Sequence, residues 1–189
     1  MNLSQAVRVL VLGDGRRFPV LPRETLHMLF PNDSDRAFAS GLTMLLGVGL
    51  LERIARGVYL NRAAPGTTER CMGWMIEALR PGHLNYLSYE SALANAGSLS
   101  QQPYWYTLAT TGNAGEYSTR YGNIAFRHTN RRRAEIYPNT VVDEPGGYLV
   151  AHPALALDDL RRAKPALVAS VDKIAHEEVV GEWGPYHAG

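Results

Sequence analysis

The stretch "LLERIARGVYLN", residues 50–61, predicts a two-stranded β-hairpin. Its halves "LLERI" and "VYLN" have the apolar and β-branched character of strands. They flank "ARG", a three-residue connection in which Gly57 supplies the left-handed turn that such a loop needs. Arg53 and Arg56 place two positive charges on this short hairpin, which raises the question of what they meet.

Three helices are expected before the hairpin. In "LSQAVRVLVL", Ser4 as an N-cap and Gly13 just past the end favour a helix. In "PRETLHMLF", Pro22 is suited to a helix N-terminus, and Pro31 ends the helix. A loop, "GDGRRFPVLP", with a short extended piece over residues 18–21, connects the two.

The third helix is expected within "NDSDRAFASGLTMLLGVG", which opens on three good capping residues, Asn32, Asp33 and Ser34. One face of this helix is apolar by its spacing. The residues of that face are Phe38, Leu42, Leu45 and Leu46. The opposite face is small and polar, with one arginine near the helix start. The residues of that face are Arg36, Ser40, Thr43 and Gly47.

Three helices followed at once by a hairpin are the element order of a winged helix-turn-helix. In that motif the third helix enters the major groove of DNA, and the hairpin, or wing, reaches the adjacent backbone. Arginines on the wing would meet phosphates, which supply most of the affinity. We therefore expect seven DNA-contacting residues: Arg36, Ser40, Thr43, Arg53, Arg56, Arg16 and Arg17. Many winged helices bind protein instead, so an interaction protein that neutralises a partner by direct contact is the alternative.

The remainder of the chain predicts a second, mixed α/β domain, so the expected fold class is α+β. "NRAAPGTTE" is a polar hinge, and we place the domains at 1–62 and 63–189. Strands are expected in "YLS", "PYWYTLATTG", "RYGNIAFRH" and "PGGYLVA". Helices are expected in "TERCMGWMIEALRPG", in the segment capped by Ser88, in "HPALALDDLRRAKP" and in "ALVASVDKIAHEEVVGEWG".

The net charge of +1 is unevenly distributed. Residues 1–62 hold eight arginines against five acidic residues, whereas residues 139–189 hold four basic residues against eight acidic ones. Arginine makes up 17 of the 19 basic residues and suits bidentate contacts to phosphate and guanine, although a GC-rich genome would produce the same bias. The single cysteine, Cys71, reads as a buried residue and excludes an internal disulfide. With neither a secretory signal nor a membrane anchor in the sequence, we expect a cytoplasmic protein.

Several blocks together resemble the AbiEi antitoxin family, over roughly residues 3–165. These blocks are the winged helix ending in "GLLERIARGVYLN", then "YLSYESALANAG", "TTGNAGEYSTRYGNIAFRH" and "YLVAHPALALDDLRRA". The resemblance implies the antitoxin half of a type IV toxin–antitoxin system of phage abortive infection. It further implies that the winged helix binds inverted repeats in the promoter of its own operon and represses transcription. The C-terminal domain would carry the antitoxin activity.

The partners implied by this resemblance are double-stranded DNA and, functionally, a nucleotidyltransferase-like toxin encoded next to the antitoxin. A stable complex with that toxin is not required. We expect a monomer or a weak dimer, with two copies on an inverted repeat spaced roughly 34–36 Å apart or a multiple of that. No membrane partner is expected.

The densest positive charge follows the strand "RYGNIAFRH". A second nucleic-acid surface there is one interpretation; a solvated loop facing the acidic C-terminal segment is the other. The residues concerned are Arg127, Arg131, Arg132 and Arg133, with Arg120 nearby.

No catalytic, metal or cofactor site is predicted. His83, His128 and His152 are too far apart in sequence for a compact metal-ligand pattern. Ser88 and His128 lack the surrounding glycine motif of a serine hydrolase. An enzyme acting on nucleic acid, or on the toxin's substrate, is a third hypothesis that a catalytic carboxylate or histidine would revive.

Overall fold

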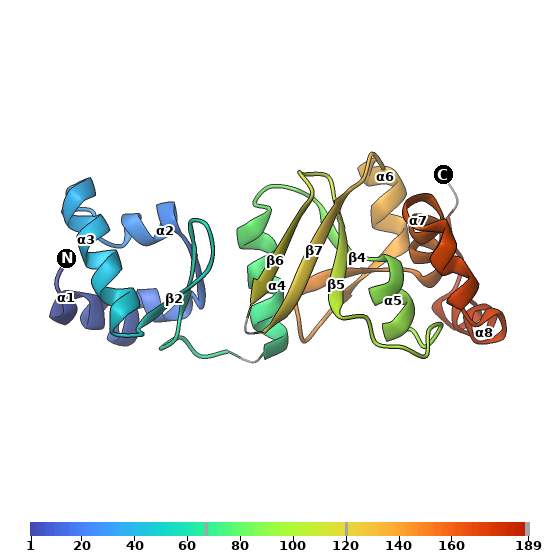
Figure 1. The fold of residues 1–189 in the computed structure, drawn as a ribbon, viewed down its shortest axis with the longest axis horizontal. Helices are drawn as coiled ribbons and strands as arrows, with labels where there is room; N and C mark the ends of the chain where they lie inside the picture. The colour runs from blue at the N-terminus through green and yellow to red at the C-terminus, as the bar shows by residue number, and fades with distance from the viewer. Residues whose placement is uncertain (67, 120, 188–189) are drawn as a thin grey trace. The chain divides into compact units, whose positions relative to one another are not determined.

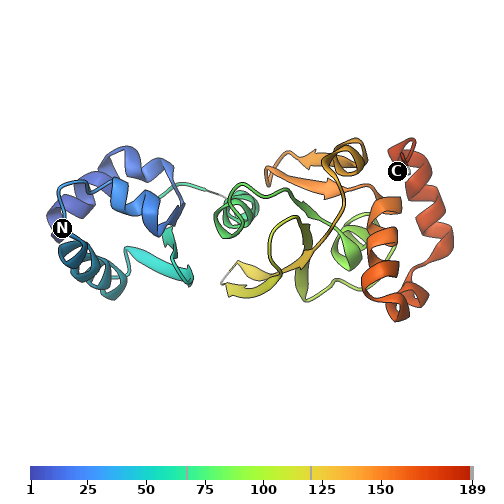
Figure 2. The same cartoon turned by 90° about the horizontal axis from the view of Figure 1, so that it is seen from above.

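The computed structural model describes residues 1–66, 68–119 and 121–187, and the chain divides into two compact units, Met1–Leu79 and Arg80–Gly189 (Figures 1 and 2). The fold class is mixed α/β, as predicted. We expected the boundary between residues 62 and 63, but the following helix, α4 (Thr68–Leu79), groups with the N-terminal unit because it packs against β1 (Val20–Pro22). Cys71 of α4 is buried, as expected.

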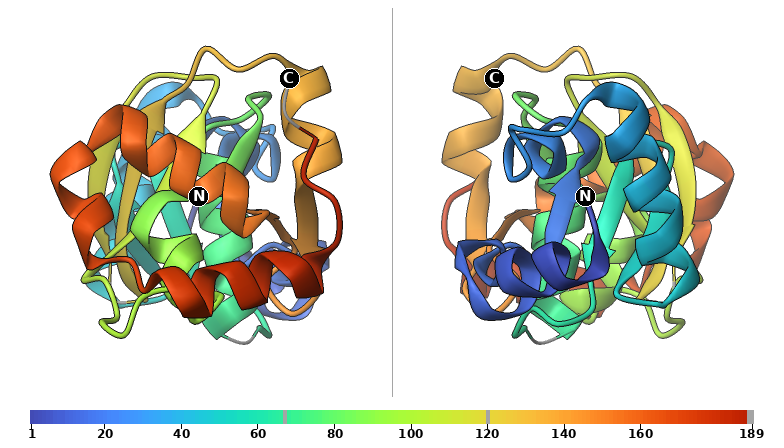
Figure 3. Two further views of the ribbon diagram at one scale, coloured as in Figure 1. Left: turned by 90° about the vertical axis from the view of Figure 1, so that its right-hand side faces the viewer. Right: turned by 90° about the vertical axis from the view of Figure 1, so that its left-hand side faces the viewer.

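The N-terminal unit has the predicted order of three helical segments followed by a hairpin (Figure 3, right). Before α4 its elements are α1 (Leu3–Val7), the π-helix η1 (Arg8–Leu12), the 3₁₀-helix η2 (Asp14–Arg17), β1, α2 (Arg23–Met28), α3 (Asp35–Gly47), β2 (Leu51–Ala55) and β3 (Val58–Asn61). The extended piece β1 pairs with β3, with Leu21 opposite Tyr59, so the hairpin becomes a three-stranded sheet of order β1-β3-β2.

The first helix begins two residues earlier than predicted. Asn2, rather than Ser4, is the N-cap, and its Oδ1 accepts a hydrogen bond of 2.8 Å from the Gln5 amide. Ser4 therefore lies inside the helix. The second half of this segment is a π-helix, which residue spacing alone does not distinguish from an α-helix.

The hairpin connection is two residues long, Arg56 and Gly57, and not the three that we predicted. The pairing shifts by one residue between Arg53 and Ala55, so a β-bulge absorbs the extra residue. Gly57 has φ +78°, the left-handed conformation expected of it.

The core of the N-terminal unit joins all three helical segments to the sheet. Its central side chains are fully or almost fully buried: Ala6, Leu10, Leu21, Leu26, Phe30, Phe38, Leu42, Leu45, Leu51 and Tyr59. Three of the four residues predicted for the apolar face of α3 belong to it, and the fourth, Leu46, packs against it. The apolar spacing thus identified the inward face correctly.

The C-terminal unit is built on a six-stranded mixed sheet of order β6-β7-β5-β4-β9-β8. Its strands are β4 (Asn85–Leu87), β5 (Trp105–Thr110), β6 (Gly115–Thr119), β7 (Gly122–His128), β8 (Thr140–Asp143) and β9 (Tyr148–Ala151). The pairs β5–β7 and β4–β9 are parallel, and the other neighbours are antiparallel. The two edge strands, β6 and β8, were not predicted.

The helices of this unit are α5 (Tyr89–Asn95), α6 (Arg133–Ile136), α7 (Pro153–Ala163) and α8 (Lys173–Trp183), with the 3₁₀-helices η3 (Tyr137–Asn139) and η4 (Pro165–Ser170). The helix α5 packs against α7 and β5, and α7 in turn contacts α8 (Figures 1 and 3). One continuous helix was predicted over residues 166–184. The segment instead breaks before Asp172, whose carboxylate caps α8 by accepting from the Ile174 and Ala175 amides.

Within the part of the chain that the structure describes, no helix is long and apolar enough to cross a membrane.

Candidate nucleic-acid interface

The outward face of α3 carries the four residues predicted for it. Ser34 caps this helix, with its Oγ accepting from the Ala37 amide at 3.3 Å. Arg36, Ser40, Thr43 and Gly47 are all exposed. The Thr43 hydroxyl donates to the Ala39 carbonyl at 3.1 Å, within its own helix. The face is therefore exposed, small and polar, with a cation at the N-terminal end of the helix.

The hairpin presents its two arginines to solvent. Arg53 and Arg56 are exposed, and the Arg53 Nε donates to the Ala55 carbonyl at 3.3 Å, which holds its stem along the bulge. Among the residues that the structure describes, none forms an ion pair with Arg36, Arg53 or Arg56. Their guanidinium charges remain available to an external anion.

The remaining pair of predicted contacts, Arg16 and Arg17, lies in η2 and is also exposed. Arg17 is 3.6 Å from the Asp14 carboxylate, but both side chains are more than four-fifths exposed, so water screens this pair strongly. Asn61 of β3 holds the backbone of this segment through hydrogen bonds from its Nδ2 to the Leu10 and Gly15 carbonyls, at 2.9 and 3.2 Å. The sheet and η2 are thereby joined.

The predicted second basic surface is not a single exposed cluster. Arg132 and Arg133 are exposed, but the Arg131 side chain is only 7% exposed, and Arg127 is partly buried. Arg132 lies 3.2 Å from Glu135, which also accepts from the Arg132 amide at 2.8 Å. Arg120 lies outside the described residues.

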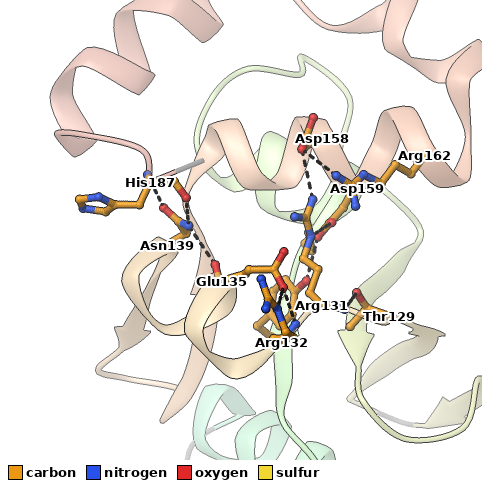
Figure 4. A network of polar contacts seen from close by, with 11 residues as sticks. Thr129, Arg131, Arg132, Glu135, Asn139, Asp158, Asp159, Arg162 and His187 are labelled. Atoms are coloured by element: carbon orange, nitrogen blue, oxygen red, sulfur yellow. Dashed lines mark hydrogen bonds and ion pairs between the residues drawn. The ribbon is translucent and has the colours of Figure 1, made fainter. Parts of the chain in front are cut away.

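Arg131 is bound inside the C-terminal unit by two consecutive carboxylates of α7 (Figure 4). Its Nε donates to Asp159 Oδ1 at 2.8 Å, and an NH2 group donates to Asp158 Oδ2 at 3.2 Å. Burial lowers the pKa of Arg131, but the hydrogen bond and the charge of Asp159 outweigh it, so the pKa is raised. Arg131 is permanently charged and neutralised internally, so it adds nothing to an external basic surface.

Asp159 is the centre of this network and was not singled out from the sequence. Its second oxygen accepts from the Tyr86 hydroxyl at 3.0 Å and from Ser88 Oγ at 2.8 Å. Burial is the main cause that raises the pKa of Tyr86, and the charge of Asp159 adds to it, so this hydroxyl remains a donor. The sequence does contain a signal: Asp159 falls on the buried face of α7, four residues after Leu155, and a carboxylate on such a face needs a charged partner.

The predicted role of Ser88 as a side-chain helix cap is wrong. Ser88 occupies the N-cap position of α5, but its hydroxyl makes no capping bond, because it points to Asp159. The next residue, Tyr89, has φ +53° and is the one non-glycine residue with positive φ in the described chain. A buried aromatic residue in this conformation is strained, and such strain is concentrated at functional sites.

Two of the histidines considered as metal ligands have structural partners. His152 caps α7, with Nδ1 accepting from the Ala154 amide at 3.1 Å, while Nε2 lies 3.2 Å from the Gly184 carbonyl. His128 lies at the end of β7 beside the Gly112 carbonyl and Asn130 Oδ1, each at 2.8 Å. Among the described residues, no group of three or more His, Cys, Asp or Glu side chains is placed to hold a metal ion.

No family model matches the chain, and no curated protein matches it. Among solved structures, the chain is similar to the crystal structure of the Rv2827c protein from Mycobacterium tuberculosis, with a TM-score of 0.55. The similarity covers 96% of this chain and 72% of that chain, at 17% sequence identity. At this identity the similarity shows a related fold and carries no conclusion about function.

Proposed function

We propose that the N-terminal unit is a winged helix-turn-helix that binds double-stranded DNA. The observation that carries this proposal is the exposure of Arg36, Arg53 and Arg56 without an ion pair among the described residues, on two consecutive elements, α3 and the β2–β3 hairpin. A helix with a polar outer face, followed at once by a basic hairpin, is what major-groove and backbone contacts require.

The expected contacts divide by chemistry. Arg36 at the N-terminal end of α3, with Ser40 and Thr43 on the same face, would read base edges, since N-terminal residues of a recognition helix lie nearest the bases. Arg53 and Arg56 on the wing would bind phosphates and supply affinity without sequence preference. Arg16 and Arg17 would add phosphate contacts from η2.

The biological role follows from the resemblance to the AbiEi antitoxins. In this proposal, the protein is a cytoplasmic antitoxin that represses its own operon from inverted repeats, and the C-terminal unit counters a nucleotidyltransferase-like toxin. The proposed role is regulatory and assigns no catalytic residue.

One observation favours the alternative of a direct protein partner. The edge strand β8 exposes Val141 and Val142 to about half of their surface. An exposed apolar edge strand can pair with a strand of another chain. Stoichiometric co-purification with the neighbouring gene product would support this function, and a β8 variant, Val142→Lys, should then abolish it.

Fluorescence anisotropy tests the DNA proposal. The full chain would be titrated onto a duplex from immediately upstream of its own gene, and onto a scrambled duplex, at several salt concentrations. Tight binding that prefers the upstream duplex and weakens steeply with salt is expected. Equal, weak binding to both duplexes would overturn the repressor function and favour the protein partner.

A further inference from the structure

A cavity of about 340 Å³ lies in the C-terminal unit at the carboxyl end of β7. Its walls include the loop residues that follow this strand, His128 to Arg131, together with Tyr89, Asp159 and Arg162. We call this cavity the β7 pocket. Because β5 and β7 are parallel neighbours, the pocket lies at the carboxyl ends of parallel strands, where ligands bind in many α/β proteins. Its size is within the range of small-molecule sites.

The inner side of the β7 pocket is buried and polar. Asp159 is 4% exposed and is held by three donors, as described above. Tyr89 is equally buried and keeps its strained φ of +53°. Burial and then the charge of Asp159 raise the pKa of Tyr89 to about 12, so its hydroxyl stays protonated and can donate a hydrogen bond.

Two arginines, Arg131 and Arg162, meet two carboxylates, Asp158 and Asp159, at the β7 pocket, so these charges balance, but they are unevenly distributed. Arg131 and Arg162 share a single oxygen of Asp158, at 3.2 and 3.5 Å, while Arg131 alone uses Asp159. The Arg162 side chain is two-thirds exposed, so its guanidinium has donors to spare. The negative charge of Glu135 is engaged by Arg132.

Two further groups bear on this site. Both oxygens beside the His128 ring nitrogens are acceptors, and the backbone hydrogen bond to Gly112, followed by that to Asn130, raises the pKa of His128. Because Asn130 presents its Oδ1 to the ring, its amide NH2 remains a donor. The Arg127 Nε is buried with no hydrogen-bond partner among the described residues, and the positive charge of Arg127 partly opposes the rise in the pKa of Tyr89.

We propose that the β7 pocket binds a small ligand through a phosphate-class oxyanion, held by Arg162 at the rim and by the Asn130 amide and Tyr89 hydroxyl inside. An exposed arginine that shares its one carboxylate oxygen with a second arginine, next to neutral donors, is an arrangement that suits phosphate oxygens. This site belongs to the C-terminal unit and goes beyond the DNA-binding function, from which it is independent.

Isothermal titration calorimetry of the full chain tests the proposal with three probes: inorganic phosphate, a nucleoside monophosphate and the matching nucleoside. Chloride at equal ionic strength is the control. Two variants with the same change on adjacent residues of α7, Arg162→Gln and Arg161→Gln, separate the site from general charge, because both arginines are exposed and Arg161 does not line the pocket. Amide chemical-shift changes with each phosphate probe locate the binding.

Saturable phosphate binding, weakened at least about tenfold in Arg162→Gln and unchanged in Arg161→Gln, is expected. The amides of residues 129–131 and 162 should shift. Tighter binding of the monophosphate than of inorganic phosphate would support the site and identify a nucleotide as the source of the phosphate group. Equal binding of the two would support the site and identify free phosphate as the ligand. The proposal is overturned if the nucleoside binds as well as the monophosphate, if both variants behave alike, or if the shifts fall only in α3 and the hairpin.

Discussion

Arg131 and Asp159 form a buried ion pair, with 2.8 Å between Nε and Oδ1 and less than a tenth of either side chain exposed. The pair joins the loop after β7 to the middle of α7, across 28 residues of sequence. Tyr86 and Ser88 of the central sheet region satisfy the other Asp159 oxygen, so no lone buried charge remains. Arg131, which belongs to a run of three arginines in the sequence, therefore contributes to the interior of the C-terminal unit and not to its surface.

Removing Arg131 should therefore destabilise the protein strongly. Arg131→Met leaves Asp159 buried without its cation, and we expect a loss of about 3–5 kcal/mol in the free energy of unfolding. The control is the adjacent Arg132→Met. The Arg132 side chain is largely exposed in its ion pair with Glu135, so this substitution should lower the free energy of unfolding by less than about 1 kcal/mol. Urea denaturation of both variants measures the difference. Similar, small losses would show that the Arg131 pair is not a structural support.

Stability should fall as the pH drops below about 6.5, the ordinary histidine value. Burial lowers the pKa of His152, so the unfolded chain takes up a proton at a pH where the folded chain still resists it. Protonating Nδ1 would also remove the acceptor for the Ala154 amide at the start of α7. His152→Asn keeps a capping oxygen and cannot titrate.

We expect the stability difference between pH 7.5 and pH 5.5 to be smaller in His152→Asn than in the wild type. Burial also lowers the pKa of His176, so part of the difference should persist in the variant. Urea denaturation at the two pH values measures it. An unchanged difference would mean that His152 does not titrate on unfolding in this range.

Arg56→Ala should weaken DNA binding by a similar factor on every sequence. Losing one phosphate contact should lower the slope of log affinity against log salt by about 0.9. Arg161→Ala, an exposed arginine of the C-terminal unit, is the matched control and should leave the slope unchanged. If anisotropy titrations over a salt series gave the wild-type slope for Arg56→Ala, the wing would not contact phosphate.

Arg36→Ala should change base preference rather than general affinity. A bidentate arginine contact to guanine is worth about 1–3 kcal/mol of discrimination, so the variant should bind an operator and its single-base substitutions more equally at one position. A panel of duplexes carrying single substitutions measures this. A uniform loss across the panel would instead make Arg36 a phosphate contact.

Gly57→Ala should destabilise the hairpin by about 1–2 kcal/mol, because an added Cβ at φ +78° is strained although it meets no atom within 4 Å. Gly47→Ala is the opposite case: its position at the end of α3 is equally open and has no positive φ. This second variant should stabilise the protein by up to about 1 kcal/mol. Thermal and urea unfolding of the two variants measures these changes in stability. Equal changes in Gly57→Ala and Gly47→Ala would show that the turn does not require glycine.

Elements whose signals are local were predictable from the amino-acid sequence. The capping residues Asn32 to Ser34 indicated where α3 begins, its apolar spacing indicated which face is exposed, and Gly57 indicated the turn of the hairpin. The exposed arginines of the N-terminal unit were predictable for the same reason, since capping, periodicity and turn chemistry act over a few residues.

Features that depend on a partner distant in sequence were not predictable, because they arise from tertiary contacts. The edge strands β6 and β8 exist only because β7 and β9 pair with them. The Ser88 hydroxyl makes no capping bond to α5, because it donates to the buried carboxylate of Asp159, 71 residues later. Arg131 and Arg132 are indistinguishable in the sequence, yet the Arg131 side chain is buried because it pairs with the distant buried carboxylate of Asp159. No local pattern indicates which arginine forms this pair.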